Sequence, residues 1–301
     1  MYLHNDKDLF SDILSETSRK YNLPVEIIEK DYFVTVFLKQ IVKAQPDIIF
    51  KGGTSLSKCF KLIERFSEDI DLNLECEQKP TEGQRRKLKA AILGVTDELG
   101  LTLTNPDNIR SRRDFNRYII DYDSAFDNSF LKQHLIVETA VFLRSYPSVK
   151  MKASCFISDY LNEINRDDII AEYGLYPFEL NVQSAERTMI DKLFALCDYY
   201  LSDTAAGHSR HIYDIYKLLG VVEINDKLRE LAAAVREERK GHTTCLSATD
   251  DVDMNALLRE IADKEIYRKD YENTTQSLLF EKVTYPEAAK ALDTIIESKI
   301  F

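Results

Sequence analysis

The spacing of apolar residues changes along the chain, from helical to alternating and back to helical. Over VEIIEKDYFVTVFLKQIV (25–42) apolar residues recur every three or four positions, which predicts a helix with one apolar face. In SEDIDLNLEC, Ile70, Leu72 and Leu74 alternate with acidic or polar residues, which predicts a half-buried strand. From about residue 184 onwards the spacing is helical almost throughout, so we expect a domain boundary near residue 180.

A short apolar run, DIIF (47–50), leads into a glycine pair and then into TSLSKCFKLI (54–63), where apolar residues return to helical spacing. This order predicts a strand, a tight turn and a helix. The same analysis predicts a further helix over 81–99 and further strands over 117–123 and 134–143.

Composition narrows the class of protein. The 301 residues are 44% hydrophobic and 30% charged, with 9 Gly and 7 Pro, which favours regular elements over disorder. The five cysteines form no CxxC pair, so we expect no disulfide framework or zinc ribbon, and a reducing compartment. No apolar run approaches the roughly 18 residues of a membrane span, and the N-terminus lacks the apolar stretch of a signal peptide. We therefore expect a soluble, cytoplasmic protein without a membrane partner.

The formal net charge of −11 opposes long-range attraction to nucleic acid, so any contact with RNA must be local. One basic cluster is dense enough to provide it: NIRSRRDFNR places Arg110, Arg112, Arg113 and Arg117 within eight positions. The same cluster also fits an ordinary solvated loop.

Carboxylates on the predicted strands are the first candidates for chemistry. Asp69 and Asp71 lie two residues apart on one strand, so their side chains point the same way and suit Mg²⁺, which takes one or two carboxylates together with substrate phosphates. Glu138, within LIVETAV, is a candidate third metal ligand on a neighbouring strand. A solvated polar strand face, or an edge-strand glutamate facing water, fits the same residues.

The glycine pair precedes hydroxyl residues at the predicted start of a helix. Gly52, Gly53, Thr54 and Ser55 therefore form a candidate phosphate cradle, although the spacing is that of neither GxGxxG nor a P-loop. Lys58 lies one turn after Thr54 and could reach a phosphate, or equally face solvent.

Four motifs in order carry a resemblance to a known family. KGGTSLSKCFKLIERFSEDIDLNL (51–74) resembles the GG[ST]-to-DxD signature of the nucleotidyltransferase superfamily, specifically the AbiEii/AbiGii toxins of bacterial abortive-infection and toxin–antitoxin systems. Upstream, IIEKDYFVTVFL resembles the EKD helix of that family. Downstream, AERTMIDKLFAL and SRHIYDIYKL resemble its two later motifs, centred on Lys192 and Asp214.

The resemblance implies an α/β (α+β) fold: a nucleotidyltransferase mixed sheet flanked by helices over 1–180, followed by a helical C-terminal domain over 181–301. It implies Mg²⁺-dependent transfer of a nucleoside monophosphate from an NTP, in characterised relatives to the 3′ end of tRNA. It also implies a cognate antitoxin, encoded alongside and forming no obligate complex. By position, Gly53, Thr54 and Ser55 would hold the triphosphate, Asp69 and Asp71 would bind Mg²⁺, and activity would depend on Lys192 and Asp214.

Considered from their residues alone, the two later motifs are compatible with this assignment but do not require it. Thr188 and Lys192 share a narrow polar stripe of a predicted helix, from which the lysine could also extend to solvent. His211 lies three residues before Asp214 and could meet it on one helix face or form a weak surface pair. The chain departs from the family in carrying Asp191 where a glutamate is common, a change that we expect to preserve activity.

Other functions fit some of the same residues. Antibiotic-modifying nucleotidyltransferases share the GG/GS and DxD motifs, and the acidic chain suits a cationic acceptor such as an aminoglycoside. A non-catalytic NTP-binding protein would keep the fold alone. Two smaller expectations are that Arg65 neutralises Asp69 in the absence of metal, and that 241–254 is an exposed loop with a solvated acidic run.

Overall fold

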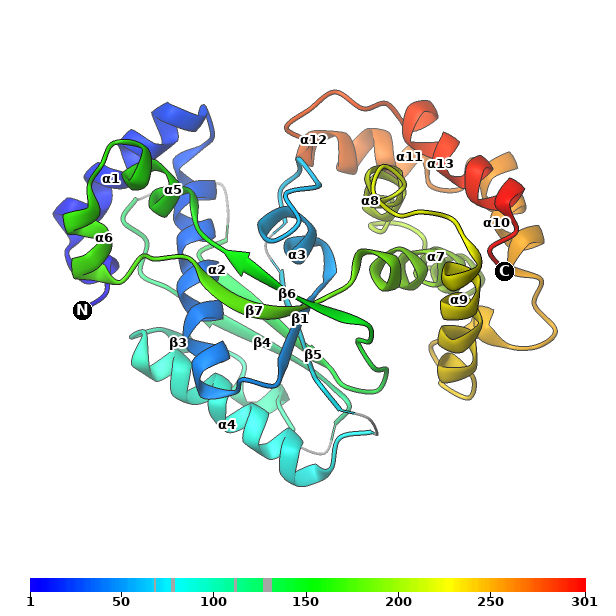
Figure 1. The fold of residues 1–301 in the computed structure, drawn as a ribbon, viewed down its shortest axis with the longest axis horizontal. Helices are drawn as coiled ribbons and strands as arrows, with labels where there is room; N and C mark the ends of the chain where they lie inside the picture. Colours follow the sequence, from blue (N-terminus) through cyan, green and yellow to red (C-terminus); the bar gives the residue numbers. More distant parts are fainter. Residues whose placement is uncertain (68, 77–78, 111–112, 127–131) are drawn as a thin grey trace. The chain divides into compact units, whose positions relative to one another are not determined.

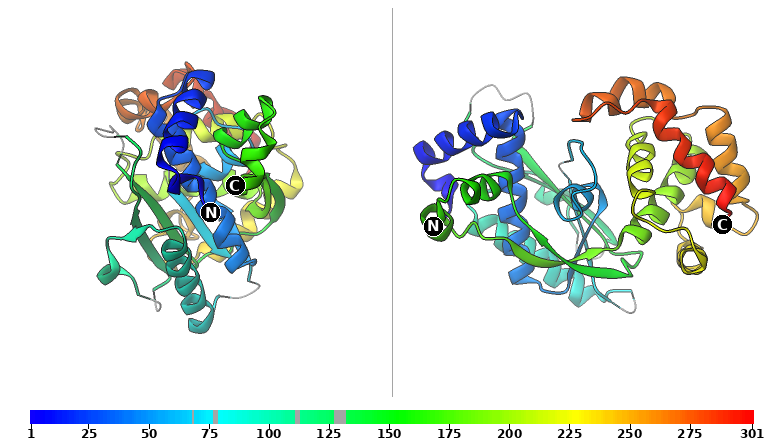
Figure 2. Two further views of the ribbon diagram at one scale, coloured as in Figure 1. Left: turned by 90° about the vertical axis from the view of Figure 1, so that its left-hand side faces the viewer. Right: turned by 45° about the horizontal axis from the view of Figure 1, so that its top comes forward.

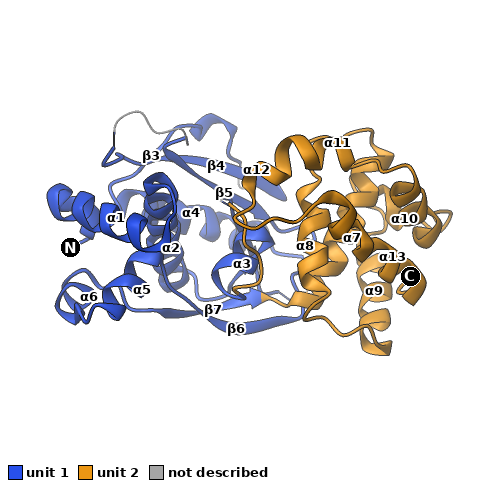
Figure 3. Ribbon diagram, turned by 90° about the horizontal axis from the view of Figure 1, so that it is seen from above, with its two compact units in different colours: residues 1–60, 67–182 blue, residues 61–66, 183–301 orange. Residues whose placement is uncertain are grey.

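The chain folds into two compact units (Figure 3). A computed structural model describes residues 1–67, 69–76, 79–110, 113–126 and 132–301. The first unit contains residues 1–60 and 67–182, and the second contains 61–66 and 183–301. The segment 61–66, expected in the first domain, thus belongs to the second unit, although it lies between the glycine pair and the DxD motif.

Two long helices open the first unit. After a short 3₁₀ turn at Leu3–Asn5, α1 (Lys7–Tyr21) starts at Asp6, whose carboxylate accepts the N–H of Leu9 as a side-chain cap. In α2 (Val25–Ala44) the seven residues 32–38 are all buried. Because seven residues make two turns, α2 is enclosed on every side and forms the centre of the core of this unit.

In the described part of the chain, seven strands form one mixed sheet in the first unit (Figure 1), in the order β3-β4-β5-β2-β1-β7-β6. β2 lies antiparallel to β1 and parallel to β5, so it occupies a central position with a neighbour on each side. The strands are β1 (Ile48–Lys51), β2 (Asp69–Leu74), β3 (Thr102–Leu103), β4 (Phe115–Asp121), β5 (His134–Ala140), β6 (Ser148–Ala153) and β7 (Phe178–Gln183).

The remaining helices of this unit include one that is shorter than predicted. The expected helix over 54–63 begins two residues earlier and ends sooner, as α3 (Gly52–Lys58), because the chain after Phe60 leaves to join the second unit. The predicted strands occur as β4 and β5, and the predicted helix 81–99 occurs as α4, which opens with a capping box between Thr81 and Gln84. The bounds of α4 are Glu82–Glu98, and the unit also contains α5 (Phe156–Glu163), α6 (Asp167–Tyr173) and a 3₁₀ turn at Pro106–Asn108.

The second unit is built from helices, apart from the last residue of β7 (Figure 2). Its core forms where α8 packs on α7 and α13, and where α10 packs on α13 and α7. Its elements are α7 (Ala185–Leu201), α8 (Arg210–Leu218), α9 (Asp226–Arg239), a 3₁₀ turn (Leu246–Ala248), α10 (Met254–Asp263), α11 (Arg268–Asp270), a π turn (Tyr271–Thr275), α12 (Gln276–Leu278) and α13 (Tyr285–Ser298). Among the described residues, no helix combines the length and the apolar character needed to cross a bilayer.

The segment 241–254 is largely the exposed loop that was predicted, with Asp250, Asp251 and Asp253 all exposed, but a few buried residues anchor it. Ser247 is fully buried, and its N–H and hydroxyl both donate to one oxygen of Asp198 on α7. Within the acidic run, Asp250 pairs with Lys240, and Asp253 accepts the N–H of Ala256 as the cap of α10. The loop is therefore a structural connection of the second unit.

Candidate active site

Acidic side chains from two neighbouring strands of the first unit line up across the sheet. Asp69 and Asp71 stand on the same face of β2, and Asp71 is the register partner of Glu138 on β5. Lys51 of β1 lies beside Asp71, and Arg117 of β4 lies beside Glu138. Sequence reasoning proposed all three carboxylates as metal ligands, and the structure adds the row across the sheet in which Asp71 and Glu138 stand between Lys51 and Arg117.

Burial and the other carboxylates of the acidic face raise the pKa of Glu138, the acid that lies between Asp71 and Arg117. Burial, followed by the negative charges of Asp71 and Asp69, raises the pKa of Glu138 to about 7. Arg117 opposes this shift only in part, with its Nε 3.5 Å from a Glu138 carboxylate oxygen. Among the described residues, no three His, Cys, Asp or Glu side chains are arranged to hold a metal ion by themselves. The hard oxygen donors present nevertheless match the preference of Mg²⁺.

Gly52 brings the glycine motif and the DxD motif together. Its φ is +77°, and a Cβ atom at this position would lie 2.0 Å from Oδ2 and 2.9 Å from Cγ of Asp71. Only glycine accommodates both the backbone angle and the neighbouring carboxylate. Gly52 therefore allows Asp71 to lie against the start of α3.

The side-chain hydroxyls of the predicted phosphate cradle make hydrogen bonds to other groups of the protein. Thr54 and Ser55 are both buried. The Ser55 hydroxyl donates to the carbonyl of Gly52 at 2.8 Å, and the Thr54 hydroxyl is 2.9 Å from that of Ser67. Since a hydroxyl has a single proton, Ser55 cannot also donate to a phosphate in this arrangement. The prediction that its hydroxyl holds the triphosphate is not supported by this geometry.

Lys58 likewise has an internal partner. The residue is 5% exposed, and its ammonium lies 2.5 Å from a carboxylate oxygen of Asp31 and 3.2 Å from the carbonyl of Ser154. The other Asp31 oxygen accepts the N–H of Phe156, the first residue of α5. Two of the three protons of the Lys58 ammonium are used by Asp31 and Ser154, and its burial indicates a structural ion pair with Asp31.

The other two residues of the EKD triplet, Glu29 and Lys30, also make hydrogen bonds to other segments of the protein. Glu29 accepts hydrogen bonds from the Ser124 hydroxyl and the Ala125 N–H. The buried Lys30 ammonium donates to the carbonyl of Lys132. Each residue of the triplet thus anchors a different segment, as expected from three consecutive positions that cannot share one helix face.

The basic cluster predicted to contact RNA is partly committed to other groups. Arg117 faces Glu138, while the side chains of Arg110 and Arg113 donate to the carbonyls of Ile109 and Asn108. Arg112 lies outside the described residues.

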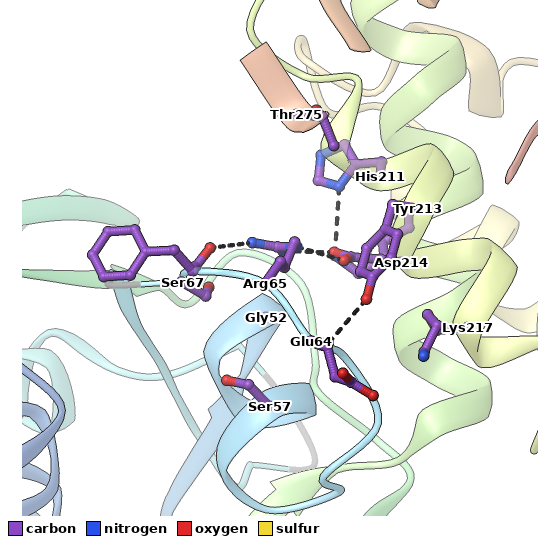
Figure 4. A network of polar contacts seen from close by, with 12 residues as sticks. Gly52, Ser57, Glu64, Arg65, Ser67, His211, Tyr213, Asp214, Lys217 and Thr275 are labelled. Atoms are coloured by element: carbon purple, nitrogen blue, oxygen red, sulfur yellow. Dashed lines mark hydrogen bonds and ion pairs between the residues drawn. The ribbon is translucent and has the colours of Figure 1, made fainter. Parts of the chain in front are cut away.

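A second charged cluster lies in the second unit and unites three separate parts of the sequence. Asp214, on α8, is fully buried. Arg65 grips its carboxylate with two parallel hydrogen bonds, Nε to Oδ1 at 2.7 Å and Nη2 to Oδ2 at 2.8 Å (Figure 4). The Lys192 ammonium, on α7, lies 2.7 Å from the same Oδ2. The proposed pairing of Arg65 with Asp69 overlooked this partner, which lies 149 residues away in the sequence.

Two cations, Arg65 and Lys192, contact the single carboxylate of Asp214 in this cluster. Burial raises the pKa of Asp214, but Arg65 and Lys192 outweigh burial and hold that pKa well below its ordinary value. Burial lowers the pKa of Lys192, Asp214 opposes the change, and Arg65 and Arg210 add to it.

His211 contacts this cluster, although its sequence position left its role open. Its Nδ1 lies 3.4 Å from the Lys192 ammonium, which has only protons to offer, so Nδ1 accepts and the ring is neutral. Burial and then the charge of Lys192 place the pKa of His211 well below 6.5. The only indication in the sequence was the spacing of three residues between His211 and Asp214.

Asp191, where the chain departs from the resemblance, contacts other charged and polar groups of the second unit. Its carboxylate lies 3.2 Å from Nε of Arg187 and 3.3 Å from Nη1 of Arg239, and it accepts from the Gln183 amide. The shorter acid is therefore held by two arginines of the same unit.

Comparison with known proteins identifies the family of the chain that carries these two clusters. The family described as nucleotidyl transferase AbiEii toxin, type IV TA system, matches residues 36–298. The chain belongs to this AbiEii family. The match includes both charged clusters and nearly all of the second unit, but it begins after the EKD triplet. A search of curated proteins finds no match.

Membership of the AbiEii family establishes the general activity. The protein is a nucleotidyltransferase and the toxin of a toxin–antitoxin system, so it has a nucleotide substrate and an antitoxin partner. The mixed sheet and the helical region that follows are those expected of a nucleotidyltransferase fold.

Proposed function

We propose that this AbiEii toxin transfers a nucleoside monophosphate from an NTP to an RNA acceptor, the 3′ end of tRNA, in a Mg²⁺-dependent reaction in the cytoplasm. The observation that carries the proposal is the acidic face of Asp69, Asp71 and Glu138, with Gly52 against Asp71. A face of this kind has little structural value, because its carboxylates repel one another.

Asp69 and Asp71 would hold Mg²⁺, with Glu138 as a further ligand. Such an ion, when bound, neutralises phosphate charge and activates a hydroxyl for in-line displacement. The contribution of the chain is to fix the carboxylates on adjacent strands, where the register aligns Asp71 with Glu138. The backbone of residues 52–54 then offers N–H groups to the triphosphate, since the Ser55 hydroxyl is bound internally.

The cluster around Asp214 would serve the same reaction by stabilising phosphate charge. Lys192 is its candidate donor, because its ammonium has three protons and shares the Asp214 carboxylate with Arg65. Asp214 itself acts as a counter-ion in this proposal: its low pKa makes it a poor proton donor at neutral pH.

The RNA acceptor follows from the family resemblance. On this chain, Arg110 and Arg113 remain the candidates for a local contact with RNA. The antitoxin would act without forming an obligate complex with the toxin.

The test is incubation of the purified protein with total tRNA, Mg²⁺ and each radiolabelled NTP in turn. Asp69→Asn and Asp71→Asn should abolish transfer, whereas Asp121→Asn, on β4 of the same sheet, should leave it intact. We expect label on RNA only with active protein and metal. Label on an added aminoglycoside, or nucleotide binding without any transfer, would refute the RNA acceptor.

A further inference from the structure

Arg65 is built into the second unit more firmly than its place in an irregular segment suggests. Its side chain is 4% exposed, and besides gripping Asp214 it donates through Nη1 to the carbonyl of Phe66 at 2.9 Å. The planar fork of a guanidinium matches a carboxylate with two aligned bonds, which a lysine ammonium cannot reproduce. Arg65 therefore fixes the orientation of the Asp214 carboxylate as well as balancing its charge.

The backbone around Arg65 is held by the C-terminal part of the chain. Arg65 forms an antiparallel bridge with Leu279: the N–H of Phe66 donates to Leu278, and the N–H of Phe280 donates to Glu64. These two hydrogen bonds are 2.9 and 2.8 Å long. Because both ends of segment 64–66 are hydrogen-bonded to residues 278–280, this segment cannot shift along its partner without losing both bonds.

A side-chain contact from α8 completes the support. The Tyr213 hydroxyl accepts the N–H of Glu64 at 2.9 Å (Figure 4). The same hydroxyl donates to Glu281. Lys217 pairs with the same Glu281 at 2.9 Å. The segment 64–66 is thus tied to residues 278–281 and to the helix that carries Asp214.

We propose that Arg65 is a positioning residue, held in place by the C-terminal segment 278–281, that orients Asp214 and through it the ammonium of Lys192. Asp214 Oδ2 is the shared atom, since it accepts from both Arg65 Nη2 and Lys192 Nζ. Without the fork, the carboxylate can rotate about its side-chain bonds, and the lysine moves with it. This gives the C-terminal segment a function beyond packing, and its catalytic consequence rests on the transfer reaction proposed above.

The first experiment compares Arg65→Lys and Arg65→Gln with Arg236→Gln. Arg236 is the matched control, because it donates to backbone carbonyls in the same unit, far along the sequence from the cluster. We expect Arg65→Lys, which keeps the charge but loses the fork, to lower kcat about tenfold or more while KM for the NTP changes less than about threefold. Arg65→Gln should also raise KM, since one of the two cations at Asp214 is lost. Wild-type kcat in Arg65→Lys, or a change confined to KM, would overturn the positioning role.

A backbone variant guards against the loss of folding when a buried pair is broken. Phe280→Pro removes the N–H that donates to Glu64, whereas Phe280→Ala keeps it. The preceding Leu279 has φ −80° and ψ 139°, the conformation that a residue before proline prefers, and the Phe280 side chain is 45% exposed. We expect Phe280→Pro to turn over at least about fivefold more slowly than Phe280→Ala. Equal rates would contradict the role of the C-terminal segment.

A further readout works even if the proposed transfer reaction fails. Trace acetylation of the amines with acetic anhydride, read by mass spectrometry across pH, reports on Lys192 with the exposed Lys264 as internal reference. Arg65→Gln removes a cation that opposes the protonation of Lys192, so its labelling midpoint should move to higher pH. An unchanged midpoint would overturn the coupling of Arg65 to Lys192, whatever the reaction catalysed.

Discussion

Gly52→Ala tests whether the glycine and DxD motifs depend on one close contact. The new Cβ would meet Asp71 Oδ2 at 2.0 Å, while real contacts of this kind stay beyond 3.0 Å, so the carboxylate must move by about 1 Å. The left-handed backbone costs a non-glycine residue about 1–2 kcal/mol. Forcing Asp71 away from its rotamer adds about 0.5–1.5 kcal/mol.

The expected result is a loss of about 2–3 kcal/mol in the free energy of unfolding and about a hundredfold in turnover, because the displaced group is a proposed metal ligand. Gly100→Ala is the matched control: Gly100 has a φ of +67° in the same unit, and nothing lies within 4 Å of its added Cβ. The chain has no Trp, so urea unfolding is followed by circular dichroism, alongside transfer assays at several Mg²⁺ concentrations. Equal stability and equal turnover in the two variants would refute the reasoning.

Three further predictions follow from individual contacts. His211 has a lowered pKa in the folded state, so protons favour the unfolded chain below about pH 6.5; His211→Gln should flatten the fall in stability there by up to about 1.4 kcal/mol per pH unit, and an unaltered pH profile from urea unfolding would contradict this. Lys58→Met leaves the half-buried Asp31 without its cation and should destabilise the fold by about 1–3 kcal/mol, with calorimetric NTP affinity unchanged; a weaker affinity would restore Lys58 as a phosphate ligand. Ser55→Ala should cost about 1 kcal/mol in thermal unfolding and leave KM for the NTP unaltered, whereas a raised KM would show that its hydroxyl does reach the triphosphate.

Much of the first unit could be predicted from local patterns. The alternation over β2 reflects which side of that strand is buried, and the three- and four-residue spacing over α2 is that of a helix. The single apolar face predicted for α2 was too narrow, because residues 32–38 are buried all round by tertiary packing. Strands β3, β6 and β7 went unpredicted. β6 has exposed residues at the edge of the sheet, so burial imposes no clear alternation on its sequence.

The helix predicted over 54–63 shows where local spacing misleads. Apolar Phe60 and Ile63 fit the helical period, but the chain after residue 60 packs with the second unit instead. Tertiary packing overrides a weak local preference, since the helix would gain only a few further residues.

The sequence by itself determined which carboxylates share a strand face and that the motifs are those of an AbiEii nucleotidyltransferase. Only the tertiary structure decided which charges meet. Arg65 and Asp214 are 149 residues apart and Lys58 and Asp31 are 27 apart, and no periodicity relates such positions. Pairing at these distances depends on which elements pack together and on the cost of leaving a buried charge without a partner.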